Sequence, residues 1–266
     1  TLIARAMERV TMDLQLVNTR FVGFGDLDDP SRTTLEVLQR EGLDRGRLGI
    51  EKNSLYLATA FADRIREGLP DAQWIDASGL VSRRRVALSP TEAAYMRQAA
   101  SITDAMMKAA IGTAREGVTE KEVAAEVHYA MIMAGGEFPA FGPFIRSTPT
   151  LGLEHGTWTD RALEAGDALF IELSGCAGRY HAPSGRFVFV GNAPPGTEKM
   201  EQICLEAFEN VTRAIRPGAT ADEVYQAWQD RVDEAGLTHY RRHHCGYMVG
   251  SAFPPAWSGG GVPRGL

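Results

Sequence analysis

The stretch Ile171–Phe189, "IELSGCAGRYHAPSGRFVF", reads as two strands joined by a glycine-rich turn. Branched and aromatic residues stand at both ends of it, as is typical of strands. The same stretch carries five side chains that can do chemistry: Glu172, Cys176, Tyr180, His181 and Arg186. Such a hairpin predicts a metal site, a metal-free acid/base site, or a strand pair with one polar face.

More strand signal surrounds this hairpin. "FIRSTP", "DALFIEL" and "GRFVFVG", between residues 144 and 191, are rich in Phe, Ile and Val. They predict a central antiparallel sheet in an α+β protein. Helical sequence both precedes and follows these strands in the chain. A long helix is expected over about Thr91–Arg115.

A helix pattern recurs about a hundred residues apart. Thr119 and Glu122 have capping-box spacing in "GVTEKEV", and Thr220 and Glu223 repeat it in "GATADEV". The first box predicts a helix from Thr119 to near Gly135. Each box follows another helix and precedes strand-like sequence, so we interpret the chain as a duplicated helix–helix–strand unit. Duplication predicts two similar halves that face each other across a pocket.

The first third of the chain has a different organisation. Residues 33–85 alternate short helical and strand-like pieces: "TTLEVLQREGLDRGRLGIE" reads as helix, turn and strand, "SLYLATAFADRIREGLP" as a helix and "AQWIDAS" as a strand. A charged connector and the Ser89–Pro90 break follow. We therefore predict a partial α/β N-terminal domain over residues 1–88 and a second domain over residues 89–266.

Composition limits the classes of partner. The chain of 266 residues has a formal net charge of −6, whereas a nucleic-acid or membrane-surface partner favours a basic face. It contains no apolar run of roughly 20 residues that could span a bilayer, and "TLIARAMERV" lacks the apolar core of a signal peptide. Three widely spaced cysteines are typical of free thiols. We expect a cytoplasmic protein with a small-molecule substrate, no nucleic acid and no membrane.

Two residues are the main catalytic candidates. His155 lies beside Gly156 between two strand signals, and a loop histidine titrates near working pH. Glu172 lies inside an apolar strand, where alternation places it on the face of Phe170 and Ser174. An inward carboxylate there must be paired or ligating. The alternatives are a solvated Glu172 or a structural cross-strand pair with Arg186.

Sequence motifs give little support for a metal centre. His181 is a single histidine, and such residues are more often structural than ligating. His243 and His244 are adjacent, so on a strand they would point to opposite faces and at most one would reach a site. We find no HxxxH, Asp pair or CxxC, and no nucleophile elbow, P-loop or Rossmann glycine pattern.

Several of these segments together resemble one family. "EHGTWTDRALEAGDALFIELSG", "GRYHAPSGRFVFVG" and the repeated "G-x-T-x-x-E-V" are similar to motifs of the creatinase/prolidase/methionine aminopeptidase family. The resemblance covers Ser89 to the end, and residues 21–87 resemble the last part of that family's smaller N-terminal domain. It implies the pita-bread fold, with duplicated halves around a curved antiparallel sheet. It also implies that both domains are incomplete and that the full-length protein is a homodimer.

The resemblance departs from the family at its metal ligands. Glu172 stands at the first metal aspartate, Pro183 at the second, and Tyr247 at the metal histidine. The family's two later glutamates have no counterpart in the sequence. We therefore expect no metal and no cofactor, the alternative being a divalent metal such as Mn, Co or Zn. Creatinase and ectoine hydrolase are metal-independent members of the family. The segments "ELSG", "RYHAP" and "GYMVGSAFPPAW" resemble the ectoine-hydrolase-like side.

The function expected from this resemblance is hydrolysis of a C–N bond in a small polar amidine, guanidine or amide, without metal. His155 and Glu172 would be catalytic. The expected substrate-binding residues are Tyr180, His181, Arg186 and Tyr247. One alternative is a metal-dependent Xaa-Pro aminopeptidase or dipeptidase, and another is a non-catalytic, ligand-binding pseudoenzyme.

Overall fold

The computed structural model describes residues 1–240 and 244–258, and the chain divides into two compact units, Thr1–Arg84 and Arg85–Leu266. The predicted boundary, after residue 88, lies a few residues beyond this division. The first unit consists of β1 (Leu2–Arg5), a 3₁₀ turn (Ala6–Glu8), α1 (Arg9–Gln15), β2 (Phe21–Phe24), α2 (Pro30–Arg40), β3 (Arg47–Ile50), α3 (Thr59–Gly68), β4 (Gln73–Asp76) and α4 (Leu80–Arg84).

Short parallel strand pairs form the first unit. β1 pairs with β2, and β3 pairs with β4. The predicted succession of helix, strand, helix and strand over residues 33–85 is confirmed by α2, β3, α3 and β4. Asp29 caps α2 by accepting a hydrogen bond from the Ser31 amide at 2.9 Å, and Pro30 occupies the first helical turn.

The second unit contains the predicted antiparallel sheet, in the order β5-β6-β7. The hairpin arms turn at Gly178 and Arg179, which both have positive φ, +54° and +66°, as a two-residue hairpin turn requires. The elements are α5 (Pro90–Thr113), α6 (Glu120–Met133), β5 (Phe144–Ser147), a 3₁₀ turn (Thr148–Thr150), β6 (Ala168–Ala177), β7 (Tyr180–Phe189), α7 (Thr197–Ala214) and α8 (Ala221–Glu234).

Capping boxes begin three of the four helices of this unit. The predicted boxes at Thr119 and Thr220 are both present, with each threonine hydroxyl accepting from the third amide and the glutamate accepting in return. Ser89 and Glu92 form another at the start of α5, where the sequence predicted a helix. These caps fix where each helix starts.

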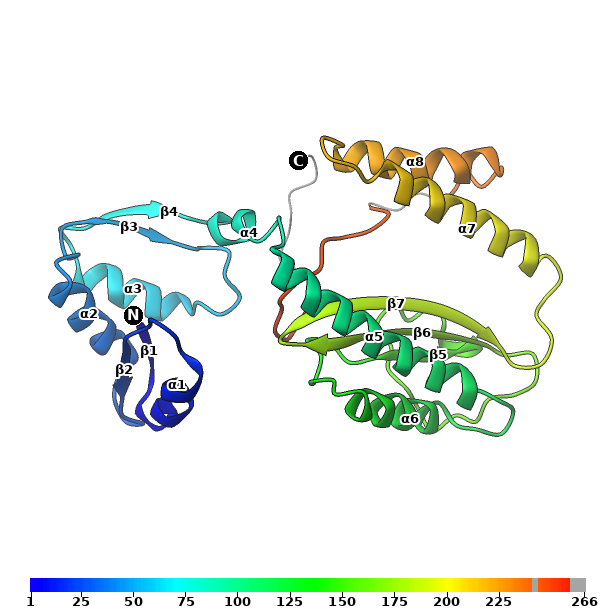
Figure 1. Ribbon diagram of the computed structural model, residues 1–266, viewed down its shortest axis with the longest axis horizontal. Coiled ribbons are helices and arrows are strands. Elements are labelled where there is room, and N and C mark those ends of the chain that lie inside the picture. Colours follow the sequence, from blue (N-terminus) through cyan, green and yellow to red (C-terminus); the bar gives the residue numbers. More distant parts are fainter. Residues whose placement is uncertain (241–243, 259–266) are drawn as a thin grey trace. The chain divides into compact units, whose positions relative to one another are not determined.

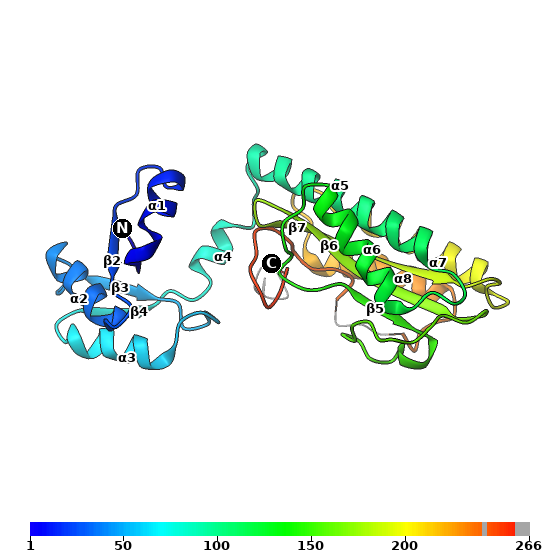
Figure 2. The same cartoon turned by 90° about the horizontal axis from the view of Figure 1, so that it is seen from below.

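Helices α5 and α6 cover one face of the sheet (Figures 1 and 2). The buried residues of α5 recur every three or four positions, so they form one continuous stripe. They are Ala99, Ile102, Thr103, Met106, Met107 and Ala110. From the sheet, Ile145 of β5 and Leu169, Ile171 and Leu173 of β6 meet them in the core.

The closest approach of α5 to the sheet is at Gly175. A Cβ atom there would lie 2.5 Å from the Ala99 carbonyl oxygen, so no larger residue fits without movement. Beside it, the buried Thr103 hydroxyl accepts from the Gly175 amide at 2.8 Å and lies 2.6 Å from the Ala182 carbonyl oxygen, to which it donates. Thr103 thus links α5 to both arms of the hairpin, three residues beyond Glu172 on the β6 side.

The second helix pair, α7 and α8, packs side by side (Figure 1). The prediction of strands after this pair is wrong for the part of the chain that the structure describes beyond α8. There the backbone forms two isolated bridges and no strand. One joins Ser251 to Tyr180 at the hairpin end, and the other joins Val249 to Ser258 within the segment. His243 lies outside the described residues. None of the helices described is long and apolar enough to span a bilayer.

Candidate active site

Glu172 lies on the face of the sheet opposite α5. Its register partners are Phe144 on β5 and Gly185 on β7, and the predicted alternation with Phe170 and Ser174 follows from this pairing. The side chain is partly buried, and no hydrogen bond or ion pair reaches it from the residues that the structure describes. Burial raises the pKa of Glu172, while the charges of His155 and Arg146 act in the opposite direction.

His155 lies in the loop between β5 and β6 and is close enough to Glu172 to affect its pKa. The imidazole is exposed and packs against two phenylalanine rings, with centroids 5.2 Å from Phe144 and 6.1 Å from Phe141. The structure therefore brings together the two residues that the sequence predicted to be catalytic.

Aromatic rings from separate segments gather around this pair. The ring centroid of Trp257 lies 5.6 Å from that of Phe141 and 6.1 Å from that of Phe144. The indole N–H of Trp257 donates to the Tyr247 hydroxyl at 2.9 Å. Burial raises the pKa of Tyr247, the hydrogen bond from Trp257 lowers it, and the charge of Glu172 raises it further. We call Phe141, Phe144, Tyr247 and Trp257 the ring cluster. Aromatic faces of this kind attract cations by about 0.5–2 kcal/mol each.

Arg146 supplies a second charge at this face. It is buried opposite Phe170, with its guanidinium carbon 4.3 Å from the centre of that ring. Its Nε donates to the Leu151 carbonyl oxygen at 3.2 Å, which ties β5 to the loop that carries His155. A positive charge and a carboxylate thus face the same space, an arrangement suited to a substrate with charges of both signs.

Tyr180 and Arg186 lie away from this site. Tyr180 donates to Glu92 of α5 at 2.9 Å and stacks on Tyr95, which anchors the hairpin end. Arg186 pairs with Ile171, on the α5 side of the sheet, where its guanidinium donates to Ser184 and to the Gly185 carbonyl oxygen. The structural alternative, a cross-strand pair between Arg186 and Glu172, is wrong, because the register puts the two side chains on opposite faces.

His181 lies in the wall beside the site. It is fully buried, and its Nε2 accepts from the Ala140 amide at 2.8 Å, next to Phe141 of the ring cluster. Burial lowers the pKa of His181, so the ring is neutral at neutral pH. The geometry gives His181 a part in holding the wall and no contact with Glu172.

The ring cluster and Arg146 were not predicted from the sequence. Phe141 and Phe144 occur in "FPAFGPF" and Arg146 in "FIRS", where a charged residue inside a short apolar strand was the available signal. Trp257 lies more than eighty residues from Glu172 in the chain, and only the tertiary fold brings it near.

The donor atoms around Glu172 do not fit a two-metal centre. The position diagonal to it on β7, next to Ser174, is Pro183, which has no ligating side chain. Within residues 1–240 and 244–258, no three His, Cys, Asp or Glu side chains gather as a metal site requires. In this part of the chain, Glu172 and His155 remain the acid/base candidates that the sequence predicts.

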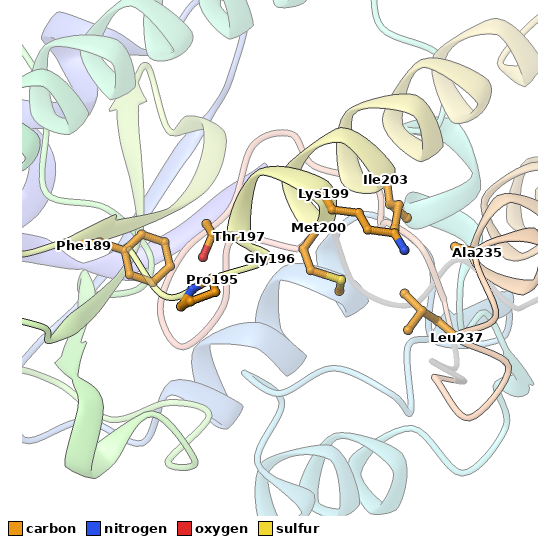
Figure 3. A pocket seen from close by; sticks show the side chains of 9 residues that line it. All are labelled: Phe189, Pro195, Gly196, Thr197, Lys199, Met200, Ile203, Ala235 and Leu237. Carbon is orange, nitrogen blue, oxygen red and sulfur yellow. The ribbon is translucent and has the colours of Figure 1, made fainter. Parts of the chain in front are cut away.

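A separate open hollow of about 480 Å³ lies between the end of β7 and the ends of α7 and α8 (Figure 3). Its lining is mostly apolar, with Lys199 as the only charged residue among the nine that line it. Carboxylates and imidazoles are absent from that lining, so the hollow contains neither of the two residues predicted to be catalytic.

The helix-covered antiparallel sheet places the protein in the class of pita-bread folds. Residues 94–262 match the metallopeptidase family M24, and residues 1–87 match the creatinase/prolidase N-terminal domain. The chain belongs to the metallopeptidase family M24, which confirms the resemblance seen in its sequence.

Named relatives include two kinds of hydrolase. Ectoine hydrolase of Halomonas elongata is 30% identical over 231 residues, which cover 83% of this chain and 57% of that protein. The Xaa-Pro dipeptidase of Pyrococcus horikoshii is 30% identical over 203 residues, which cover 76% of this chain and 57% of that protein. The prolidase structure from Pyrococcus furiosus superposes with a TM-score of 0.80 at 27% identity, over 95% of this chain and 71% of that one. The chain thus spans little more than half the length of these curated relatives.

Proposed function

We propose that the protein hydrolyses a C–N bond in a small polar amidine, guanidine or amide compound, without a metal, in the manner of ectoine hydrolase or creatinase. The observation that carries this proposal is the partly buried carboxylate of Glu172, which has no hydrogen-bond or ion-pair partner among the described residues and lies beside His155 and the ring cluster. A carboxylate whose pKa is raised by burial gains from binding a cation, and flat aromatic faces add to that preference.

In the proposed mechanism, Glu172 holds the cationic group of the substrate or assists in activating water. His155 takes a proton from the attacking water and then gives one to the departing nitrogen. The water hydroxyl ends on carbon and the proton on nitrogen, so the bond is cleaved with no other reactant. Tyr247 lines the pocket through its contact with Trp257. The cytoplasmic location and the full-length homodimer stay predictions.

Substitution of His155 in the full-length protein tests the proposal. With amidine and guanidine substrates, His155→Ala should lower kcat by about 10²–10⁴-fold, the usual contribution of a general base. His239→Ala is a matched control, since His239 is exposed and contacts only a tilted neighbouring ring, that of Tyr240, among the ring contacts of the described residues. An unchanged rate in His155→Ala would remove His155 from the mechanism.

A second candidate is a metal-dependent Xaa-Pro dipeptidase, which the Pyrococcus horikoshii relative and the family favour. Metal analysis of the purified protein separates the two functions. Stoichiometric Mn, Co or Zn, lost together with Xaa-Pro cleavage on chelation, would establish the peptidase and refute the proposal. Turnover of an amidine that persists after chelation would support it.

A further inference from the structure

The loop that carries His155 is closed at its base by one buried carboxylate. The loop, residues 148–158, runs from Ser147 at the end of β5 to Thr159. Glu120, the first residue of α6, binds both ends. One of its oxygens accepts from the Ser147 amide at 2.7 Å and the Ser147 hydroxyl at 2.6 Å. The other accepts from the Thr159 amide at 2.8 Å and the Thr159 hydroxyl at 2.7 Å.

This carboxylate is deeply buried, with 1% of the residue exposed. Burial raises the pKa of Glu120, but the hydrogen bonds from Ser147 and Thr159 outweigh it and leave the pKa below its usual range. Arg161 also donates to the Ser147 hydroxyl at 2.9 Å and forms a bidentate pair with Asp167. Glu120 is therefore ionised and fully hydrogen-bonded.

Backbone bonds already attach one end of the loop to α6. The Lys121 amide donates to the Thr159 carbonyl oxygen at 3.1 Å, and the Glu120 amide donates to the Arg161 carbonyl oxygen at 3.0 Å. The Glu120 side chain adds the link to Ser147, and thus to the strand that presents Phe144 to Glu172. What it fixes is the position of the loop relative to the active face of the sheet.

We propose that Glu120 is a positioning residue, which holds the two ends of the His155 loop together so that His155 faces Glu172. Its kinetic consequence rests on the proposed function, whereas its structural consequence does not. Misplacement of a catalytic group by about 1 Å can cost a hundredfold in rate, so a loosened loop lowers kcat more than it changes KM.

The test is Glu120→Gln in the full-length protein. The glutamine oxygen can still accept from one end of the loop, but its NH₂ group meets two donors at the other end. Glu122→Gln is the matched control, because it makes the same charge change on the same helical turn, and glutamine can serve in a capping box. The first readout is the NMR signal of ¹³C-labelled His155, assigned by its loss in His155→Ala. Glu172→Gln should shift this signal in the parent and in Glu122→Gln, but not in the Glu120→Gln background.

The second readout is turnover. Glu120→Gln should lower kcat by about 10–100-fold with KM within about threefold, while Glu122→Gln stays within twofold of the parent. If Glu120→Gln fails to fold, Thr159→Val, which removes one of the four donors, takes its place and should weaken the response of His155 to Glu172→Gln. An undiminished response in a folded variant overturns the proposal, whether or not turnover falls. The NMR result stands even if the parent hydrolyses no amidine, so the failure of the proposed function is seen separately.

Discussion

Replacement of Thr103 by valine should destabilise the second unit severely, although the two side chains have the same shape. The change leaves the buried Gly175 amide and the Ala182 carbonyl without their hydroxyl partner, at about 1–3 kcal/mol for each group. A methyl group would also stand where the hydroxyl approaches these atoms to 2.8 and 2.6 Å, which is too close for carbon. We expect a loss of about 3–5 kcal/mol from the free energy of unfolding.

Urea unfolding followed by circular dichroism measures this loss, and hydrogen exchange of peptides from β6 and β7 shows where it falls. Thr103→Ser is the matched control, because it keeps the hydroxyl and removes one methyl group, at a cost of about 1 kcal/mol. A Thr103→Val protein within 1 kcal/mol of Thr103→Ser would refute the assignment of the hydroxyl as the bridge between the strands.

Two further predictions concern single ionisable groups. The pKa of Glu172 is raised in the folded protein, so its ionisation destabilises the fold as pH rises through that pKa. Glu172→Gln should therefore be more stable than the parent at pH 7.5 while losing turnover. Burial raises the pKa of Cys176 to about 11, whereas Cys204 is exposed. Iodoacetamide at pH 8 should therefore alkylate Cys204 at least about 100-fold faster, as measured by peptide mass spectrometry.

A specific result would contradict each of these two predictions. The stability gain of Glu172→Gln should vanish well below pH 4.5, where the glutamate is protonated in both states. A gain that is independent of pH would mean that packing, not charge, is responsible. Equal alkylation of Cys176 and Cys204 in the native protein would show that the interior of the hairpin opens readily.

Local signals in the sequence predicted much of the fold. Capping boxes and apolar spacing located α5, α6 and α8, because each helix end is determined by residues within one turn of it. Strand alternation placed Glu172 correctly with Phe170 and Ser174, since neighbouring positions on one strand depend only on that strand.

What the sequence failed to predict depends on contacts between distant segments. The family resemblance implied that Arg186 binds substrate, but the side of the sheet on which Arg186 lies is set by the strand register, which starts at the turn. The ring cluster combines residues from three segments, and no local pattern links Phe141 to Trp257. Buried Glu120 resembled an ordinary first-turn acidic residue, because its partners are 27 and 39 positions away.

The two-residue turn at Gly178 and Arg179 has an evolutionary consequence. Successive residues of β7 point to opposite faces of the sheet. The length of the turn therefore determines which alternate set of β7 side chains faces Glu172. A single-codon insertion there would move Arg186 and Tyr180 to the active face and withdraw Pro183. Substrate preference on this scaffold can therefore change in one genetic step that substitutes no residue of β6 or β7.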